Sequence, residues 1–382
     1  MRVLHIAQSV SGGIASYLEE IAAYQLGKFG SHSVRFLVPA GNRHHLPSVP
    51  LAQLIEFSPC SRSAAGFAAL WWSARREIAG FMPDVVHLHS TYAGVMGRLA
   101  LPVFGARPSI VYCAHGWSFG MEAARWKQKL YATVERALLP ATDMIVNISH
   151  SDHALAQVNG IPSARMTTIR NGIAPVVPSG ATLAQQFDHR KLNLIFVGRH
   201  DRQKGLDILI DAFLSSGRSD MQLHVVGAPV LDWDSGLVAG EHRLNVTFHG
   251  WQSRDAVSQL IAASDALVMP SRWEGFGLVA LEAMRLGKPV LASRRGALSE
   301  IVHHGRNGWL FDISDVSELR GLLSSLDKSC LSDMGDAARQ DFLDSFTSDR
   351  LNSELVALYE YLARRKLRST AGLGLERLWR HE

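Results

Sequence analysis

The sequence has few cysteines and no long apolar run. Its 382 residues include three cysteines, Cys60, Cys113 and Cys330, which lie far apart and form no C-x-x-C pair. This spacing excludes a disulfide framework and a cysteine-based zinc site, and it is typical of a reducing compartment. Apolar runs stay well short of the ~18 residues that a membrane-spanning helix needs. Residues 1–7 are typical of a strand and not of a signal peptide, so we expect a cytoplasmic protein.

The sequence also has little excess charge. Its formal net charge is +4, which by itself does not indicate a nucleic-acid partner. The charge is uneven, however, because residues 1–180 carry 15 basic and 9 acidic side chains, whereas the remainder carries 24 and 26. We therefore expect the first half to face any anionic surface or acceptor. Hydrophobic residues make up 47% of the chain and charged residues 19%, which excludes a disordered or fibrous protein.

Short apolar runs rich in β-branched residues alternate with helical patterns throughout. This order predicts parallel sheets covered by helices on both faces. The pattern breaks between about 172 and 190, where glycine, proline and polar residues indicate a linker. We predict an α/β protein with two Rossmann-like, doubly wound domains that face a cleft. The predicted parts are a first domain at 1–175, a second at 190–346, a helix at 347–368 that packs back on the first domain, and a tail at 369–382.

The expected elements can be placed along the chain. Strands are predicted near 2–7, 34–38, 85–89, 110–114, 144–148, 166–169, 194–198, 222–226, 245–248, 266–269 and 289–292. Helices are predicted near 14–29, 63–79, 121–139, 151–159, 205–216, 254–263, 277–287, 315–326, 331–343 and 348–367. In doubly wound sheets ligands bind beyond the carboxyl ends of the strands, so the functional residues should follow strands.

Two clusters of unusual residues follow predicted strands of the second half. In residues 198–205, Arg199 and Lys204 flank a turn that opens a helix, and such a pair of cations suits a diphosphate. In residues 270–284, Glu274 lies on a loop and Glu282 on the helix that follows. Carboxylates accept hydrogen bonds from sugar hydroxyls, while amides at the helix start favour an anion. The alternative is a solvated basic loop and an ordinary surface glutamate.

The first half has weaker signals. Ser11-Gly12-Gly13 ends the first strand and precedes a helix, which suits an anion or simply a tight turn. The pattern G-x-G-x-x-G is absent, which argues against a nicotinamide-dependent oxidoreductase. We expect His115 in the cleft because it ends a strand. His87 and His89 share a strand, and we expect one to be packed and the other to lie near the cleft. With no third ligand placed, no metal site is predicted there. The D-x-D form of residues 232–234 is interpreted as a solvated loop.

These motifs resemble a known family. Residues 198–205, 274–282 and 287–290 are similar to the nucleotide-sugar half of glycosyltransferase family 4, whose members have the GT-B fold. Residues 11–13, 83–89, 115–116 and 171–172 are similar to its other half, and the resemblance covers about residues 1–345.

The resemblance implies a role for each matching residue. Glu282 would bind the donor ribose, Arg199 and Lys204 the diphosphate, Glu274 hydroxyls of the donor sugar, and His115 would lie near the transferred sugar. The implied catalytic residues are Arg199, Lys204, Glu274 and His115. The implied donor-binding residues are Gly13, Gly198, Gly275, Phe276, Gly277, Leu278 and Glu282. The family retains the anomeric configuration, and the implied mechanism is a front-side displacement without a metal or other cofactor.

The resemblance predicts a glycosyltransferase that moves a sugar from a nucleotide-diphosphate sugar to a glycan or lipid-linked acceptor. Surface polysaccharide or glycolipid synthesis is the family's usual setting. Aromatic and basic residues adjoin at 71–76 and 125–129, which predicts peripheral membrane contact unless the tryptophans belong to the core. The alternatives are a GT-B sugar-nucleotide epimerase and a non-catalytic subunit that binds sugar nucleotides.

Overall fold

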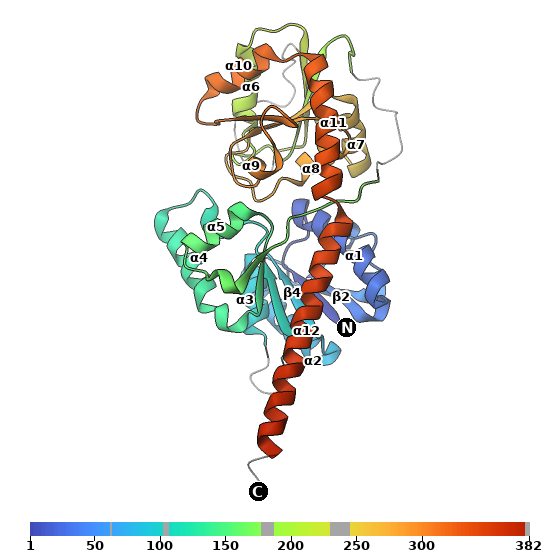
Figure 1. Ribbon diagram of the computed structural model, residues 1–382, viewed down its shortest axis with the longest axis vertical. Coiled ribbons are helices and arrows are strands. Elements are labelled where there is room, and N and C mark those ends of the chain that lie inside the picture. Colours follow the sequence, from blue (N-terminus) through green and yellow to red (C-terminus); the bar gives the residue numbers. More distant parts are fainter. Residues whose placement is uncertain (62, 102–106, 177–186, 230–244, 379–382) are drawn as a thin grey trace. The chain divides into compact units, whose positions relative to one another are not determined.

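The computed structural model describes residues 1–61, 63–101, 107–176, 187–229 and 245–378, and side chains as far as Lys366. The chain forms two compact units (Figure 1). Unit 1 comprises Met1–Gly172 and Ser348–Glu382, and unit 2 comprises Ile173–Thr347. Each unit is built on one parallel sheet with helices on both of its faces, as predicted from the alternating pattern. The prediction of two Rossmann-like, doubly wound domains is thus confirmed.

Unit 1 contains a seven-stranded sheet with the order β3-β2-β1-β4-β5-β6-β7, in which every pair is parallel. Its strands are β1 (Val3–Ala7), β2 (Val34–Pro39), β3 (Leu54–Phe57), β4 (Val85–His89), β5 (Ser109–Cys113), β6 (Met144–Asn147) and β7 (Met166–Thr168). Its helices are α1 (Gly12–Phe29), α2 (Ala64–Phe81), α3 (Thr91–Leu99), α4 (Arg125–Ala137), α5 (His150–Val158) and α12 (Ser348–Leu378).

Alternation along the strands divides the core of unit 1 between two faces of the sheet. Leu4 and Ile6 of β1 pack in one apolar cluster with residues of α2, α3, α4 and α5. His5 lies between them in the sequence and therefore points to the opposite face, where it contacts Gln25 of α1. The second face thus carries α1 and α12, and it is the face on which buried polar side chains collect.

Unit 2 contains a six-stranded parallel sheet with the order β10-β9-β8-β11-β12-β13. Its strands are β8 (Leu192–Val197), β9 (Met221–Val226), β10 (Val246–Gly250), β11 (Ala266–Met269), β12 (Val290–Ser293) and β13 (Gly308–Phe311). Its helices are α6 (Leu206–Ser215), α7 (Arg254–Ala263), α8 (Leu278–Arg285), α9 (Leu298–Ile301), α10 (Val316–Ser325) and α11 (Lys328–Ser345). Leucine and phenylalanine side chains of α6 and leucines of α10 fill the core against the strands.

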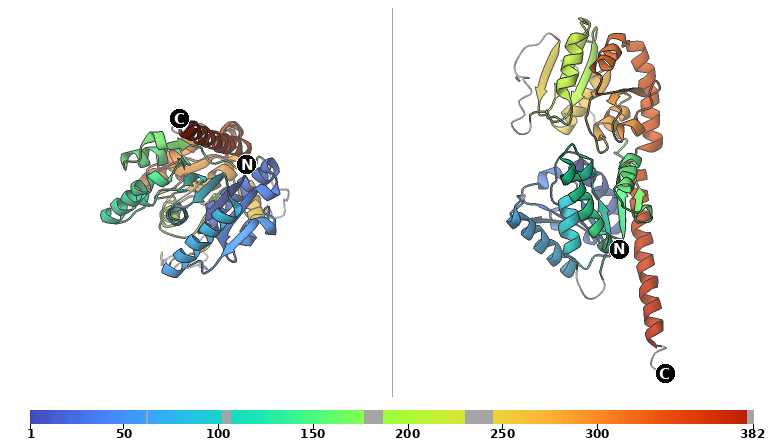
Figure 2. Two further views of the ribbon diagram at one scale, coloured as in Figure 1. Left: turned by 90° about the horizontal axis from the view of Figure 1, so that it is seen from below. Right: turned by 90° about the vertical axis from the view of Figure 1, so that its left-hand side faces the viewer.

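Helix α12 belongs to unit 1, although α11 of unit 2 precedes it directly in the sequence. Leu355 and Tyr359 are fully buried, and the Tyr359 hydroxyl hydrogen-bonds His87 Nδ1 at 2.6 Å. Helix α12 continues to Leu378, beyond the predicted end of this helix at 368 (Figure 2). Leucine, glutamate and arginine between 373 and 378 favour a helix, whereas Gly372 and Gly374 disfavour one.

Four of the described α-helices and strands have no counterpart in the prediction, namely β3, α3, α9 and β13. The cysteines form no disulfide, since Cys60, Cys113 and Cys330 are all free. Across the described ranges, no helix has both the length and the apolar character that a membrane crossing requires.

Candidate functional site

In unit 2 the predicted residues collect where the sheet topology reverses. Strands β8 and β11 are neighbours, but β9 and β10 continue the sheet on one side and β12 and β13 on the other. Loops that leave the carboxyl ends of two such strands diverge and leave space for a ligand. The loop after β8 carries residues 198–205, and the loop after β11 carries residues 270–277.

Glycine allows these two loops to approach closely. Gly205 has φ +69°, and a Cβ atom at this position would lie 2.0 Å from the carbonyl oxygen of Pro270. Gly296 plays a similar part on the following loop, because a Cβ there would lie 2.3 Å from the carbonyl oxygen of Glu274. Any side chain at either glycine would have to displace the loop after β11.

An ion pair joins the two loops. Lys204 Nζ lies 2.5 Å from Glu274 Oε2, and both side chains are largely buried. Ser271 Oγ donates a weaker hydrogen bond to the same oxygen at 3.3 Å. The structure therefore brings together two of the four predicted catalytic residues, which are 70 positions apart in the sequence.

Arg272 fixes the geometry of this pair, although the sequence analysis assigned it no role. Its guanidinium forms a two-pronged ion pair with Asp207 at the start of α6, with N–O distances of 3.0 and 2.6 Å. It also donates to the carbonyl oxygen of Arg202 at 2.7 Å, while its backbone amide donates to the carbonyl of Gln203 at 2.8 Å. An arginine among carboxylates and glycines gives no pattern of its own, so only the structure reveals this function.

Arg199 lies on the same loop as Lys204 but is turned toward its own neighbours. Its guanidinium is 3.0 Å from Asp201 Oδ2 and donates to Gln203 Oε1 at 3.0 Å. About half of the side chain is exposed, so the guanidinium can exchange these partners for a ligand phosphate at little cost. Gly198 precedes Arg199. A Cβ atom at Gly227 would lie 1.9 Å from the carbonyl oxygen of Gly198.

The start of α8 offers unblocked backbone donors. Gly277 caps this helix with φ +90°, and no side chain there accepts a hydrogen bond from the first-turn amides. Gly275 and Leu278 are partly exposed, whereas Phe276 is buried and packs edge-on against Phe346. The buried ring of Phe276 thus holds the turn in place. A ligand can reach the backbone of Phe276 but not its ring.

Glu282 lies on α8, as predicted, about one turn from the start of the helix, and the residue is partly buried. Burial raises its pKa, and the charges of Arg285 and Arg254 oppose that rise. A carboxylate held this way is suited to accept hydrogen bonds from a pair of hydroxyl groups.

Unit 1 has its own reversal point between β1 and β4. Gly13 is exposed at the start of α1, whose amides are not capped by a side chain. His115 follows β5 and has φ +56°, and Ser90 follows β4 with φ +77° and ψ +161°. Positive φ in non-glycine residues is costly and concentrates at functional sites. Nothing in the sequence pattern signals the backbone conformation of Ser90.

The expectation for His87 and His89 was wrong. Residues two apart on a strand share a face, so both side chains point to the face that carries α1. Their ring centroids are 4.1 Å apart, and both rings are completely buried. His5 is the third histidine that the prediction lacked, and ligand atoms of the three lie within 4.8 Å of one another.

The histidine cluster is hydrogen-bonded internally, and this bears on its capacity for a metal. His5 uses both ring nitrogens, one toward Gln25 and one toward His89, and His89 uses its second nitrogen toward His115. A cation would have to break these bonds to gain ligands. The D-x-D segment at 232–234 lies outside the described residues.

Comparison with known proteins identifies the family. The family model described as "Glycosyl transferases group 1" matches residues 184–341, and that described as "Glycosyl transferase 4-like domain" matches residues 12–172. An uncharacterized 41.2 kDa protein in the cps region of Klebsiella pneumoniae is 27% identical over 94% of this chain and 99% of that protein.

Two further proteins extend the comparison. A D-inositol 3-phosphate glycosyltransferase of a Mycobacterium species is 30% identical over 64% of this chain and 58% of its own length. The crystal structure of HepE from Anabaena, with UDP and glucose, superposes with a TM-score of 0.79 at 22% identity and covers 94% of this chain and 100% of that one. Because the two family models together match most of the chain, the protein belongs to the family-4-like glycosyltransferases, which are glycosyltransferases of the GT-B type.

Proposed function

We propose that this protein is a retaining, metal-independent glycosyltransferase that uses a nucleoside-diphosphate sugar. The observation that carries the proposal is the Lys204–Glu274 pair at the reversal point of unit 2. A lysine suited to phosphate and a carboxylate suited to sugar hydroxyls lie side by side there. In a nucleoside-diphosphate sugar, phosphate oxygens and sugar hydroxyls adjoin in the same way.

Donor binding would use residues whose surroundings are already arranged. Arg199 and Lys204 would neutralise the diphosphate, together with the backbone at Gly275–Leu278 and the exposed turn at Gly13. Glu282 would accept hydrogen bonds from the ribose, and Glu274 from the sugar. Lys204 would exchange part of its contact with Glu274 for a phosphate oxygen, so that the carboxylate becomes free for hydroxyls.

The chemical step would depend on stabilising the departing nucleoside diphosphate. Arg199 and Lys204 supply two positive charges at the leaving group, the role for which other transferases employ a metal ion. The acceptor hydroxyl would attack from the side that the diphosphate leaves and transfer its proton to a phosphate oxygen, which retains the anomeric configuration. His115 would contact a hydroxyl of the transferred sugar.

The acceptor is proposed to be a glycan or a lipid-linked sugar. The Klebsiella relative comes from a cps region, which supports a setting in surface polysaccharide or glycolipid synthesis. The complexes of HepE with UDP and UDP-glucose support a nucleotide-sugar donor.

Peripheral contact with the inner face of the cell membrane is part of the proposal. Trp126 and Leu130 of α4 are exposed by 64% and 52%, and Lys127 and Lys129 lie between them. Apolar side chains next to cations favour an anionic bilayer surface.

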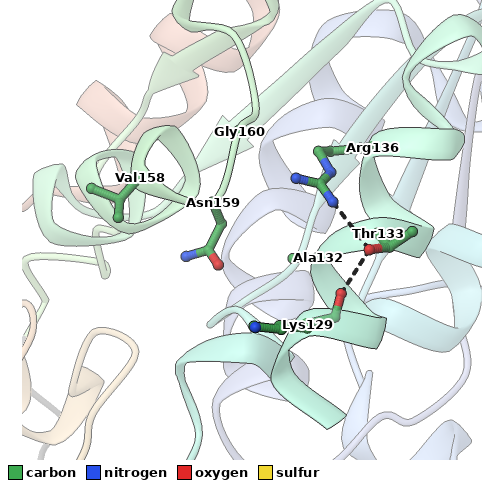
Figure 3. A pocket seen from close by; sticks show the side chains of 7 residues that line it. All are labelled: Lys129, Ala132, Thr133, Arg136, Val158, Asn159 and Gly160. Carbon is green, nitrogen blue, oxygen red and sulfur yellow. Dashed lines mark hydrogen bonds between the residues drawn. The ribbon is translucent and has the colours of Figure 1, made fainter. Parts of the chain in front are cut away.

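A pocket beside this helix fits an anionic headgroup. It is lined by α4 and the end of α5, and Lys129 and Arg136 supply its cations (Figure 3). Trp71, by contrast, packs on the core and donates to the carbonyl of Leu99, as the alternative interpretation held, whereas Trp72 is 63% exposed. Flotation with vesicles of phosphatidylglycerol should carry the protein, and a Trp126→Ser/Leu130→Ser variant should stay behind. Equal flotation of both would exclude α4 as the contact.

The function is tested with a thermal-shift panel of UDP-, GDP- and ADP-sugars, followed by product analysis with the donor that stabilises most. We expect a product with the donor's anomeric configuration, formed equally with and without EDTA. An epimer of the donor formed without acceptor would indicate an epimerase. Tight donor binding without any turnover across a panel of glycan acceptors would indicate a non-catalytic subunit.

A further inference from the structure

A continuous row of hydrogen-bonded side chains crosses the α1 face of the unit 1 sheet. Gln25 Oε1 is 2.9 Å from His5 Nε2, His5 Nδ1 is 3.0 Å from His89 Nε2, and His89 Nδ1 is 3.0 Å from His115 Nε2. We call His5, His89 and His115 the imidazole chain. Gln25, His5 and His89 are at most 1% exposed, so water does not compete for these bonds.

We propose that the imidazole chain sets the tautomer of His115, with Gln25 as the residue that fixes its direction. The Gln25 Oε1 atom can only accept, so His5 carries its proton on Nε2 and accepts on Nδ1. His89 must then donate from Nε2 and accept on Nδ1. His115 in turn donates from Nε2, which leaves Nδ1 as an unprotonated acceptor.

A chain of this kind requires neutral rings, and the surroundings supply that condition. Burial lowers the pKa of His5 to about 4 and that of His115 to about 3. Burial and the neighbouring histidines also lower the pKa of His89. Each ring is therefore neutral near pH 7, with one donor and one acceptor.

The backbone and the packing hold His115 at the end of the chain. Its φ of +56° is strained for a residue with a side chain, and Tyr17 packs edge-on against its ring with centroids 4.7 Å apart. Within the described part of the chain, its Nδ1 has no hydrogen-bond partner. A fixed, unprotonated Nδ1 accepts a hydrogen bond from a sugar hydroxyl and rejects an acceptor such as a carbonyl oxygen. This use of the chain rests on the proposed function, whereas the tautomer itself does not.

A metal site is the competing interpretation of the same histidines. A cation bound by His5, His87 and His89 would take nitrogens that the imidazole chain already uses, and only Nε2 of His87 is buried without a partner. The two interpretations differ in a measurable way, because a metal would remove the proton from His89 Nε2.

The test is a long-range 1H–15N correlation spectrum of the full chain labelled with 15N-histidine. A His115→Asn variant assigns the His115 signals by their loss. We expect His115 to be protonated on Nε2 and not on Nδ1. Gln25→Met removes the fixed acceptor, so both tautomers of His115 should be populated.

Gln53→Met is the matched control, because Gln53 is a buried glutamine of the same unit outside the chain. It should leave the His115 signals unchanged. In turnover, Gln25→Met should lower kcat/KM about tenfold, the size of one neutral hydrogen bond, with nucleotide affinity unchanged. Protonation of His115 on Nδ1, an unchanged tautomer in Gln25→Met, or histidine signals that change on EDTA treatment would each overturn the proposal. The predicted tautomers without any transferase activity would instead refute the proposed function alone.

Discussion

Replacing Lys204 with methionine tests the charge that the proposed mechanism needs most. The substitution keeps the length of the side chain and removes its positive charge. An ammonium about 4 Å from a phosphate oxygen contributes on the order of 4 kcal/mol at an effective dielectric constant of about 20. Donors that stabilise a developing negative charge typically contribute about 100- to 1,000-fold in kcat. We therefore expect kcat to fall at least ~100-fold.

The assay is release of nucleoside diphosphate with the donor chosen by thermal shift. Lys204→Met also leaves the largely buried Glu274 carboxylate without its ion pair, so its melting temperature must be measured alongside. Lys328→Met is the matched control, because Lys328 pairs with Asp265 at 3.3 Å in the same unit but lies outside the strand-end loops. Lys204→Arg should keep part of the activity. A folded Lys204→Met enzyme with kcat within threefold of wild type would refute the charge argument.

Three further outcomes follow from individual residues. Glu282→Ala should weaken binding of the nucleoside diphosphate by about 10- to 100-fold in calorimetry, the size of hydrogen bonds to a charged group, whereas an unchanged Kd would remove Glu282 from the ribose site. Gly205→Ala should lower the free energy of unfolding by at least ~2 kcal/mol, because its Cβ would lie 2.0 Å from the carbonyl oxygen of Pro270. Gly217→Ala is the control, since Gly217 also has φ +69° but has open space around it, and this substitution should cost about 1 kcal/mol. Equal costs would refute the close approach. His5 is neutral in the folded state with a pKa of about 4, below its unfolded value of about 6.5, so its stabilisation is complete above pH 6.5 and is lost as the pH falls toward 4. The free energy of unfolding should therefore be about 2 kcal/mol lower at pH 5 than at pH 6.5 because of this group. His5→Gln should lose that part of the pH dependence, and an unchanged pH dependence in the variant would contradict the assignment.

The sequence was sufficient for most strands because each is a short apolar run between helical patterns, but it missed β3 and β13 at the sheet edges. It was insufficient for α3, whose Gly94 and Gly97 disfavour a helix on propensity alone. The structure explains both glycines, since a Cβ at Gly94 would lie 2.4 Å from the ring of Tyr112, and one at Gly97 would lie 2.3 Å from Leu88. Close packing of α3 on the sheet overrides propensity here.

The candidate site was predictable where its residues sit directly after strands. Lys204 and Glu274 were expected after strands of the second domain, and parallel pairing of β8 with β11 brings them together. Arg272 and the contact of Gln25 with His5 were not predictable, because both depend on side chains that meet across separate elements. The error at His87 and His89 was of another kind, a wrong use of strand periodicity.

In the proposed function, Arg199 and Lys204 bind the diphosphate of the donor while other residues bind its nucleoside. Calorimetry with the preferred nucleoside diphosphate and its parent nucleoside tests this division. Wild type should bind the diphosphate far more tightly than the nucleoside. In an Arg199→Met/Lys204→Met variant this preference should fall by about 100-fold or more, because each charged contact contributes about 1.5 kcal/mol or more. The affinity for the nucleoside should be unchanged. A preference for the diphosphate that survives both substitutions would contradict the account.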